Sequence, residues 1–269
     1  MSIYKPSGRR MSQSSIRNGV LSGFLYDTDA EAYLIAVETA DNASLEYGVR
    51  QAITKFIIDC KTDGNWTAIK AACILCGART LSGALVPLVG TSPTNNNFVS
   101  GDYSRTLGLL GNGTTKWLNS NRNNNADPQN SHHMATYISV AGGSDKVYIG
   151  AGAATNETGA SNFGPTGSLL FTRSRNSGQQ NAGTTQAGFI CISREASGSY
   201  MFRNNQTTST LTVASQTPAN ANIGVLAATN GAYPAPARIA YYSIGEAVTL
   251  STLDSRVTTM MTSIQAALA

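Results

Sequence analysis

The chain has 269 residues, of which 41% are hydrophobic and only 13% are charged, with a net charge of +4. A helical bundle or coiled coil would use far more Ala, Glu, Lys, Leu and Arg, and a disordered chain would carry fewer hydrophobic residues. The 26 glycines and 22 asparagines suit short strands joined by turns, because both residue types tolerate positive φ. The composition therefore predicts a mainly β protein with a sizeable core.

The positive charge lies at the start of the chain. Residues 1–26 are rich in Ser and Gly and contain four basic residues and no acidic one, so the other 15 basic residues are matched by 15 acidic ones. Four dispersed charges without aromatic neighbours make a weak nucleic-acid site, and no nucleic-acid partner is expected. We interpret the segment as an attachment arm whose docking residues are Lys5, Arg9, Arg10 and Arg17.

Residues 27–90 have a helical pattern. Thr28 and Glu31 have the spacing of a capping box, and the apolar residues that follow recur at i, i+3, i+4 and i+7. A second helix comes next, and a third is expected over 66–76 with Asn65 as its cap. Three helices with short joints predict a packing or oligomerisation segment.

Residues 91–249 contain about ten short apolar or alternating runs separated by Gly, Asn, Ser and Pro, which indicates a two-sheet sandwich or jelly roll. Residues 250–269 return to an apolar helical stripe, for which Ser251 is the expected cap. The predicted fold class is mainly β with a helical block (α+β). It comprises an N-terminal arm, a three-helix segment, an antiparallel β-sandwich of the jelly-roll type and a C-terminal helix.

Residues with catalytic chemistry are few. The two histidines, His132 and His133, are adjacent, so along a strand they point to opposite faces, and no Gly-x-Ser-x-Gly motif is present. Cys73 and Cys76 lack a second pair at zinc-site spacing, which favours buried apolar side chains. We predict no catalytic residue, metal or cofactor. The polar start and the lack of an 18-residue apolar run predict no signal peptide and no membrane insertion, hence synthesis in the cytoplasm.

The segment 117–130 is the best concentration of polar side chains. Asn and Arg beside one aromatic ring are typical of sites that bind sugar hydroxyls. The predicted glycan-contact residues are Trp117, Asn121, Arg122, Asn123 and Asp127. Two other interpretations stay open: Asp127 and its Asn neighbours supply oxygen ligands suited to Ca²⁺, or the segment is a plain polar loop with Trp117 in the core. The run 173–181 has the same ambiguity.

Three strings in the chain are distinctive: GARTLSGALVPLVG at 77–90, NFVSGDYSR at 97–105 and AYYSIGE at 240–246. They resemble the helical-plus-sandwich module of structural proteins in tailed bacteriophages, notably cyanophages and marine phages. The sandwich part resembles the concanavalin or laminin-G type of jelly roll. The resemblance covers residues 27–269 and transfers no ligand-binding residue.

The resemblance implies a non-enzymatic virion protein: a tail fibre or receptor-binding component, anchored by its arm to other tail or capsid proteins, with a lectin-like outer domain facing a host glycan. A capsid decoration (cement) protein is the alternative, since the chain is short for a fibre. A jelly-roll carbohydrate-active hydrolase and a lectin-like module outside any virus are further alternatives. A homotrimer is expected, because closed symmetric assembly would bury apolar helix faces.

Overall fold

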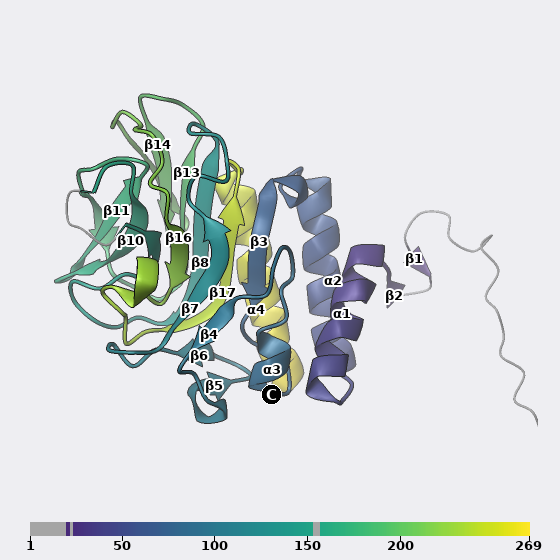
Figure 1. Ribbon diagram of the computed structural model, residues 1–269. Helices are drawn as coiled ribbons and strands as arrows, with labels where there is room; N and C mark the ends of the chain where they lie inside the picture. The colour runs from purple at the N-terminus through teal and green to yellow at the C-terminus, as the bar shows by residue number, and fades with distance from the viewer. Residues whose placement is uncertain (1–19, 22–23, 153–156) are drawn as a thin grey trace, which may run out of the picture.

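The computed structural model describes residues 20–21, 24–152 and 157–269. These residues form a two-sheet β-sandwich with helices on one side (Figure 1). The predicted fold class, mainly β with a helical part and a C-terminal helix, is confirmed. The predicted docking residues of the arm, Lys5, Arg9, Arg10 and Arg17, lie outside the described residues.

All strand pairs are antiparallel, and the two main sheets have seven and eight strands. The seven-stranded sheet runs in the order β12 (Gln180–Thr184), β11 (Leu169–Ser174), β10 (Ser161–Thr166), β9 (Ile149–Ala151), β16 (Asn222–Val225), β7 (Trp117–Asn123) and β4 (Thr94–Asn96). The path of the other sheet is β15 (Thr207–Leu211), β14 (Tyr200–Asn204), β13 (Gly188–Arg194), β8 (His132–Val140), β17 (Arg238–Gly245), β6 (Gly108–Leu110) and β5 (Tyr103–Ser104), with β3 (Ile69–Ile74) also paired to β17. A short hairpin, β1 (Val20–Leu21) with β2 (Phe24–Leu25), precedes the helices.

Four helices accompany the sheets: α1 (Thr28–Asp41), α2 (Tyr47–Thr62), the short α3 (Leu81–Ala84) and α4 (Leu250–Leu268). Helices α2 and α4 lie against the outer face of the eight-stranded sheet, with α1 beyond them (Figure 1). Phe56 of α2 meets Tyr241 of β17 edge to face, with ring centroids 5.8 Å apart. The outer face of the seven-stranded sheet lies on the other side of the molecule, away from these helices.

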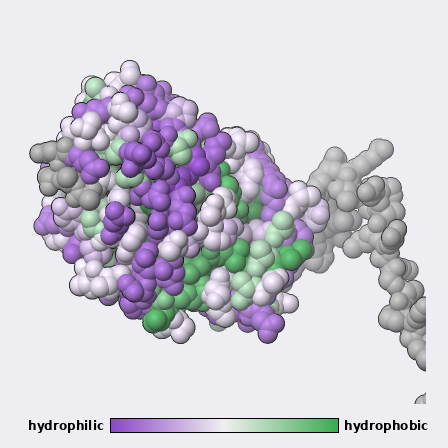
Figure 2. Space-filling model, in the orientation of Figure 1, coloured by the Kyte–Doolittle hydropathy of each residue, from purple (hydrophilic) through white to green (hydrophobic). Residues whose placement is uncertain are grey.

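Two apolar cores follow from this layering. One lies between the sheets and includes the fully buried Leu118, Phe163 and Ile190. The other lies between the eight-stranded sheet and the helices and joins Phe56 to Tyr241. In the view of Figure 2, hydrophilic residues cover much of the sandwich, and apolar residues gather toward the helical side. Side chains alternate along each strand, so one sheet contributes to both cores and the other to one.

The expected third helix is wrong, because residues 69–74 form the strand β3. Its Cys73 lies opposite Tyr242 of β17. Cys73 faces the core between the sheets, whereas Ile74 faces the core beneath the helices. A strand that is buried on both faces is a nearly continuous apolar run, and such a run cannot be distinguished from a buried helix by periodicity alone.

The cap of α1 is one residue earlier than predicted. Asp27, not Thr28, is the N-cap, and its side chain accepts hydrogen bonds from the backbone N–H groups of Asp29 and Ala30 at 3.0 and 3.2 Å. Asp27 has extended backbone angles while Thr28 is already helical. A carboxylate at this position also favours the positive end of the helix dipole.

Asn65 does not cap a helix over 66–76 as expected; its side chain bonds instead to the start of a distant helix. Its side-chain oxygen accepts from the backbone N–H of Thr249 at 3.0 Å, and its amide donates to Thr252 at 2.9 Å. Thr249, rather than the expected Ser251, is the N-cap residue of α4. Asn65 thus ties the end of the α2 region to the start of the C-terminal helix.

The four cysteines are free and buried, which confirms the predicted burial of Cys73 and Cys76, although Cys73 lies on a strand and not on a helix. Burial raises the pKa of Cys60, Cys73 and Cys76 to about 12, so these thiols stay protonated and unreactive at neutral pH. Within the described part of the chain, no helix combines the length and apolar character needed to cross a membrane.

Candidate functional site

The predicted glycan-contact segment begins on β7. Trp117 is half-buried and packs on the backbone of Gly231, where a Cβ atom would approach its indole nitrogen to 2.6 Å. Asn121 has a φ of 56° and donates to the backbone oxygen of Ser92 at 2.8 Å and to Thr94 Oγ1 at 3.0 Å. The amide of Asn121 therefore joins β7 to the start of β4.

The other three predicted contact residues also have partners within the chain. The Asn123 amide donates to Asn220 at 2.8 Å. The Arg122 guanidinium contacts both carboxylate oxygens of Asp127, which is 5% exposed. A cationic group of the chain itself thus occupies the side of Asp127 that a calcium ion would need. None of the five predicted contact residues lines either of the two cavities described next, and sugar contact by them stays a prediction.

A cavity of about 190 Å³ opens on the outer face of the seven-stranded sheet. We call it the Tyr233 pocket. Strands β10 and β11 and the loops at 145–147, 179 and 233 form it. Its lining residues are Asp145, Val147, Asn162, Thr166, Phe171, Arg173, Gln179 and Tyr233.

A pair of polar side chains lies at the base of the Tyr233 pocket. Asn162 on β10 is directly opposite Arg173 on β11, and Arg173 Nε donates to Asn162 Oδ1 at 3.0 Å. Asn162 Nδ2 is buried and has no hydrogen-bond partner among the described residues. Leaving a buried donor unsatisfied costs about 1–3 kcal/mol. An acceptor oxygen on a ligand would remove that cost.

Tyr233 presents an aromatic ring at the mouth of the pocket. The residue is 46% exposed and has a φ of 52°, which is rare for a bulky side chain. Its backbone oxygen accepts from the Val147 N–H at 2.9 Å, which holds the strained loop in place. Asp145, with a φ of 54°, is fixed by a 2.8 Å hydrogen bond from Thr166. Strained residues of this kind cluster at functional sites.

The charges at the Tyr233 pocket nearly cancel. Arg173 and Asp145 both line it. Burial lowers the pKa of Arg173, and the carboxylate of Glu157 acts in the opposite direction. A cavity with one cationic and one anionic side chain, with a second carboxylate beside the cation, attracts neither anions nor cations strongly.

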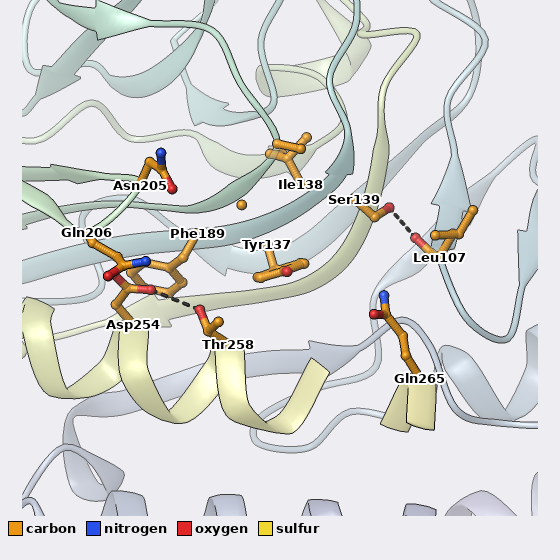
Figure 3. Close-up of a pocket in the computed structure, with 12 residues that line it drawn as sticks. Leu107, Tyr137, Ile138, Ser139, Phe189, Asn205, Gln206, Asp254, Thr258 and Gln265 are labelled. Carbon is orange, nitrogen blue, oxygen red and sulfur yellow. Dashed lines mark hydrogen bonds between the residues drawn. The ribbon is translucent and has the colours of Figure 1, made fainter. Parts of the chain in front are cut away.

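A second cavity, of about 270 Å³, lies where α4 meets the end of the β8–β13 pair (Figure 3). We call it the Tyr137 pocket. Asp254, Thr258 and Gln265 point into it from α4, and the two-residue turn between β14 and β15 borders it. Its lining residues are Leu107, Tyr137, Ile138, Ser139, Ala187, Gly188, Phe189, Asn205, Gln206, Asp254, Thr258 and Gln265.

The two histidines lie away from both cavities. His132 and His133 are fully buried, and His133 Nε2 lies 3.0 Å from Ser243 Oγ. Burial lowers the pKa of His133 to about 4, so the ring is neutral at physiological pH. Among residues 20–21, 24–152 and 157–269, no group of three His, Cys, Asp or Glu side chains is placed to hold a metal ion.

Part of the Tyr233 pocket comes from a segment whose polar character is visible in the sequence. The polar run 173–181 contributes Arg173 and Gln179 to its lining. Tyr233 and Asn162 are not predictable from local sequence, because the pocket joins residues that are about 70 positions apart. The signal available for Tyr233 was an aromatic residue placed between Gly231 and Pro234 in a turn.

No protein-family model matches the chain, and no curated protein matches it in sequence. Several solved structures resemble it at low identity. The binding domain of botulinum neurotoxin serotype D has a TM-score of 0.49 and 10% identity, over 71% of this chain and 50% of that chain. Domain 4 of the arabinanase AbnA from Geobacillus stearothermophilus, in complex with arabinotriose, has a TM-score of 0.40 and 14% identity, over 62% of this chain and 82% of that one.

A further similar structure is the CBM40 domain of Ruminococcus gnavus IT-sialidase bound to α2,3-sialyllactose. It has a TM-score of 0.36 and 11% identity, and the match covers 48% of this chain and 82% of that one. A match to NanB covers only 27% of the NanB chain. Because these TM-scores are below 0.5, we argue the function from the cavities of this chain.

Proposed function

We propose that this chain is a non-enzymatic glycan-binding protein and that the Tyr233 pocket is its sugar site. The observation that supports the proposal is the pairing of an exposed ring, Tyr233, with a buried and unpartnered donor, Asn162 Nδ2, in one cavity. A sugar presents an apolar C–H face to an aromatic ring and acceptor oxygens to such a donor. Small-ligand sites commonly combine apolar surface with a few fixed polar groups in this way.

The ligand that fits best is a neutral sugar. Arg173 and Asp145 oppose each other in charge, so the pocket offers no excess cation to an acidic sugar. The volume of about 190 Å³ lies below the roughly 300 Å³ at which pockets for drug-sized ligands begin. One ring of a longer glycan would enter the pocket. Trp117, on β7 of the same sheet, is the residue we propose for contact with a further ring.

We further propose that the glycan belongs to a host surface and that the chain is a virion structural protein. In this proposal it is a tail fibre or receptor-binding component, assembled as a homotrimer and anchored by Lys5, Arg9, Arg10 and Arg17. The phage-like strings of the sequence support the virion role. The position of the pocket supports an outward-facing sugar site, because its residues on β10 and β11 belong to the sheet that lies away from the helices (Figure 1). A capsid decoration protein would use the same anchor without a glycan.

The sugar site is tested by glycan-array and calorimetric binding with the full chain and two variants. Tyr233→Ala removes the ring, and we expect at least a tenfold loss of affinity for the neutral glycans that the unaltered protein binds. Tyr26→Ala, which also removes a half-exposed ring, is the matched control and should bind normally. Equal binding by Tyr233→Ala and the unaltered protein would refute the site.

The virion role is tested separately by mass spectrometry of purified particles. Deleting residues 1–26 should prevent incorporation while the remaining chain stays folded. Incorporation of the truncated protein at normal levels would show that the basic segment is not the anchor. A polysaccharide-degradation assay with Asp127→Ala and Glu195→Ala addresses the hydrolase alternative. Degradation by the unaltered protein that is lost in either variant would support a hydrolase and contradict the non-enzymatic role.

A further inference from the structure

The Tyr137 pocket has an aromatic surface that the fold does not cover completely. Tyr137 on β8 is half-buried and lies between the sheet and α4 (Figure 3). Phe189 on β13 is opposite Tyr137 in the ladder and is 2% exposed, so it forms the floor. Leu107 is 38% exposed at the rim. Helices α2 and α4 cover other parts of this sheet face but leave the end of the β8–β13 pair open.

Polar groups with unused hydrogen-bonding capacity surround these rings. Within the described residues, neither the half-buried Tyr137 hydroxyl nor the exposed Gln206 amide has a hydrogen-bond partner in the chain. Gln265 reaches only the backbone oxygen of Thr106, at 3.4 Å. A hydroxyl and two amides supply both donors and acceptors around an apolar surface.

The backbone conformation of Gln206 is a second, independent indication that the Tyr137 pocket binds a ligand. Asn205 and Gln206 form the two-residue turn between β14 and β15, with φ values of 45° and 67°. Such hairpin turns require positive φ at both positions and favour Asn followed by Gly. Gln at the second position is strained relative to Gly. The strained residue is therefore one whose side chain lines the pocket, and backbone strain of this kind is common at functional sites.

The pocket is electrically balanced. Among the described residues that line it, Asp254 is the sole charged one. Arg203 Nε donates to one oxygen of Asp254 at 2.7 Å, and Thr258 donates to the other at 3.0 Å. The carboxylate charge is therefore neutralised by a residue behind the wall of the pocket. A neutral ligand with several hydroxyl groups suits this lining better than an anion or a cation.

We propose that the Tyr137 pocket is a second saccharide site, so that one chain binds two neutral sugar rings at separate places. The Tyr137 ring stacks on the sugar, and Gln206 and Gln265 bond its hydroxyls. The inference shares the ligand class of the proposed function but none of its residues. Two sites on one chain raise the avidity for a branched or dense glycan without any new contact.

The test uses the full chain with the Tyr233 site disabled, so that the two sites are separated. Tyr233→Ala is titrated with methyl β-D-galactopyranoside, methyl β-D-glucopyranoside and methyl α-D-mannopyranoside, with binding followed by two-dimensional NMR. We expect residual binding of at least one probe, with shifts at residues of the Tyr137 pocket. Absence of binding in Tyr233→Ala, while the unaltered protein binds, overturns the second site and leaves the proposed function intact. Absence of binding in both proteins overturns both.

Variants of the Tyr137 pocket then identify its residues. In the Tyr233→Ala background, Gln206→Gly should weaken sugar binding at least fivefold without lowering the melting temperature, because Gly adopts positive φ without strain. Asn42→Gly, which changes a residue with a φ of 50° at the end of α1, is the matched control and should bind normally. Tyr137→Phe keeps the ring and should lose less affinity than Tyr137→Ala. Undiminished binding in both Gln206→Gly and Tyr137→Ala overturns the proposal.

Discussion

The two outer faces of the sandwich show how one architecture gives a packed surface and an open one. On the eight-stranded sheet, the outward residues include Ala135, Cys191 and Tyr241, all buried beneath α2 and α4. On the seven-stranded sheet, β10 and β11 place Asn162 and Arg173 outward. Apolar outward residues require a covering layer, since their burial is favourable by roughly 25 cal/mol per Å². Polar outward residues leave a face on which a ligand can bind.

The comparison of the two faces is tested most strongly by truncating one buried ring in the apolar cluster at each face. Phe56→Ala removes the ring that meets Tyr241, and we expect the free energy of unfolding to fall by about 3–5 kcal/mol. Phe171, which is 4% exposed, belongs to a small cluster with Val147 and Ala228, so Phe171→Ala should cost less. Urea denaturation measures both values. An equal or larger loss for Phe171→Ala would show that the seven-stranded face also has a structural core.

The second prediction concerns the donor in the Tyr233 pocket. Asn162→Asp preserves shape, keeps an acceptor for Arg173 and removes the unpartnered Nδ2 donor. We expect affinity for a neutral glycan to fall about tenfold, which corresponds to about 1.4 kcal/mol, while the melting temperature is retained because the new carboxylate pairs with Arg173. Calorimetric titration and thermal unfolding give the two numbers. Retained affinity would show that the Asn162 donor does not contact the sugar.

The smallest expected effect concerns acid sensitivity of the helical side. Hydrogen bonds from Arg256 lower the pKa of Asp63, and those from Arg105 lower the pKa of Glu46. A folded-state pKa below the unfolded value contributes stability above the unfolded pKa, near 4, and this stability is lost as the pH falls through the folded value. The helical side should therefore weaken below about pH 4.

Arg256→Ala tests whether this stabilisation is present at neutral pH and lost in acid. Arg256 holds Asp63 by two hydrogen bonds, of 2.7 and 3.1 Å, in a partly exposed pair. We expect a loss of about 0.5–1 kcal/mol at pH 7 and a much smaller loss at pH 2, measured by urea denaturation at both values. Lys146→Ala, a basic residue on the sandwich side, is the control. A loss of unfolding free energy in Arg256→Ala that is larger at pH 2 than at pH 7 would contradict the lowered pKa of Asp63.

Local sequence determined much of the fold. The apolar stripes at i, i+3, i+4 and i+7 were sufficient for α1, α2 and α4, and the turn residues were sufficient to indicate a sandwich of short strands. Residues 69–74 were misassigned, because a strand buried on both faces lacks the alternation that identifies strands. Asn65 illustrates the same limit at one residue: it was expected to cap a helix directly after it, but its side chain bonds to Thr249, the residue before α4.

The proposed functional residues also divide into those visible in the sequence and those that only long-range contacts bring together. The sequence by itself determined that the chain has few side chains suited to acid–base catalysis and that polar side chains gather at 117–130 and 173–181. Only the tertiary structure decided that Asp127 is paired with Arg122 and that Asn162 and Tyr233 share one cavity. The reason is physical: composition and local pattern fix which groups are available, whereas hydrogen-bond partners and cavities arise from strand pairing between residues far apart in the chain.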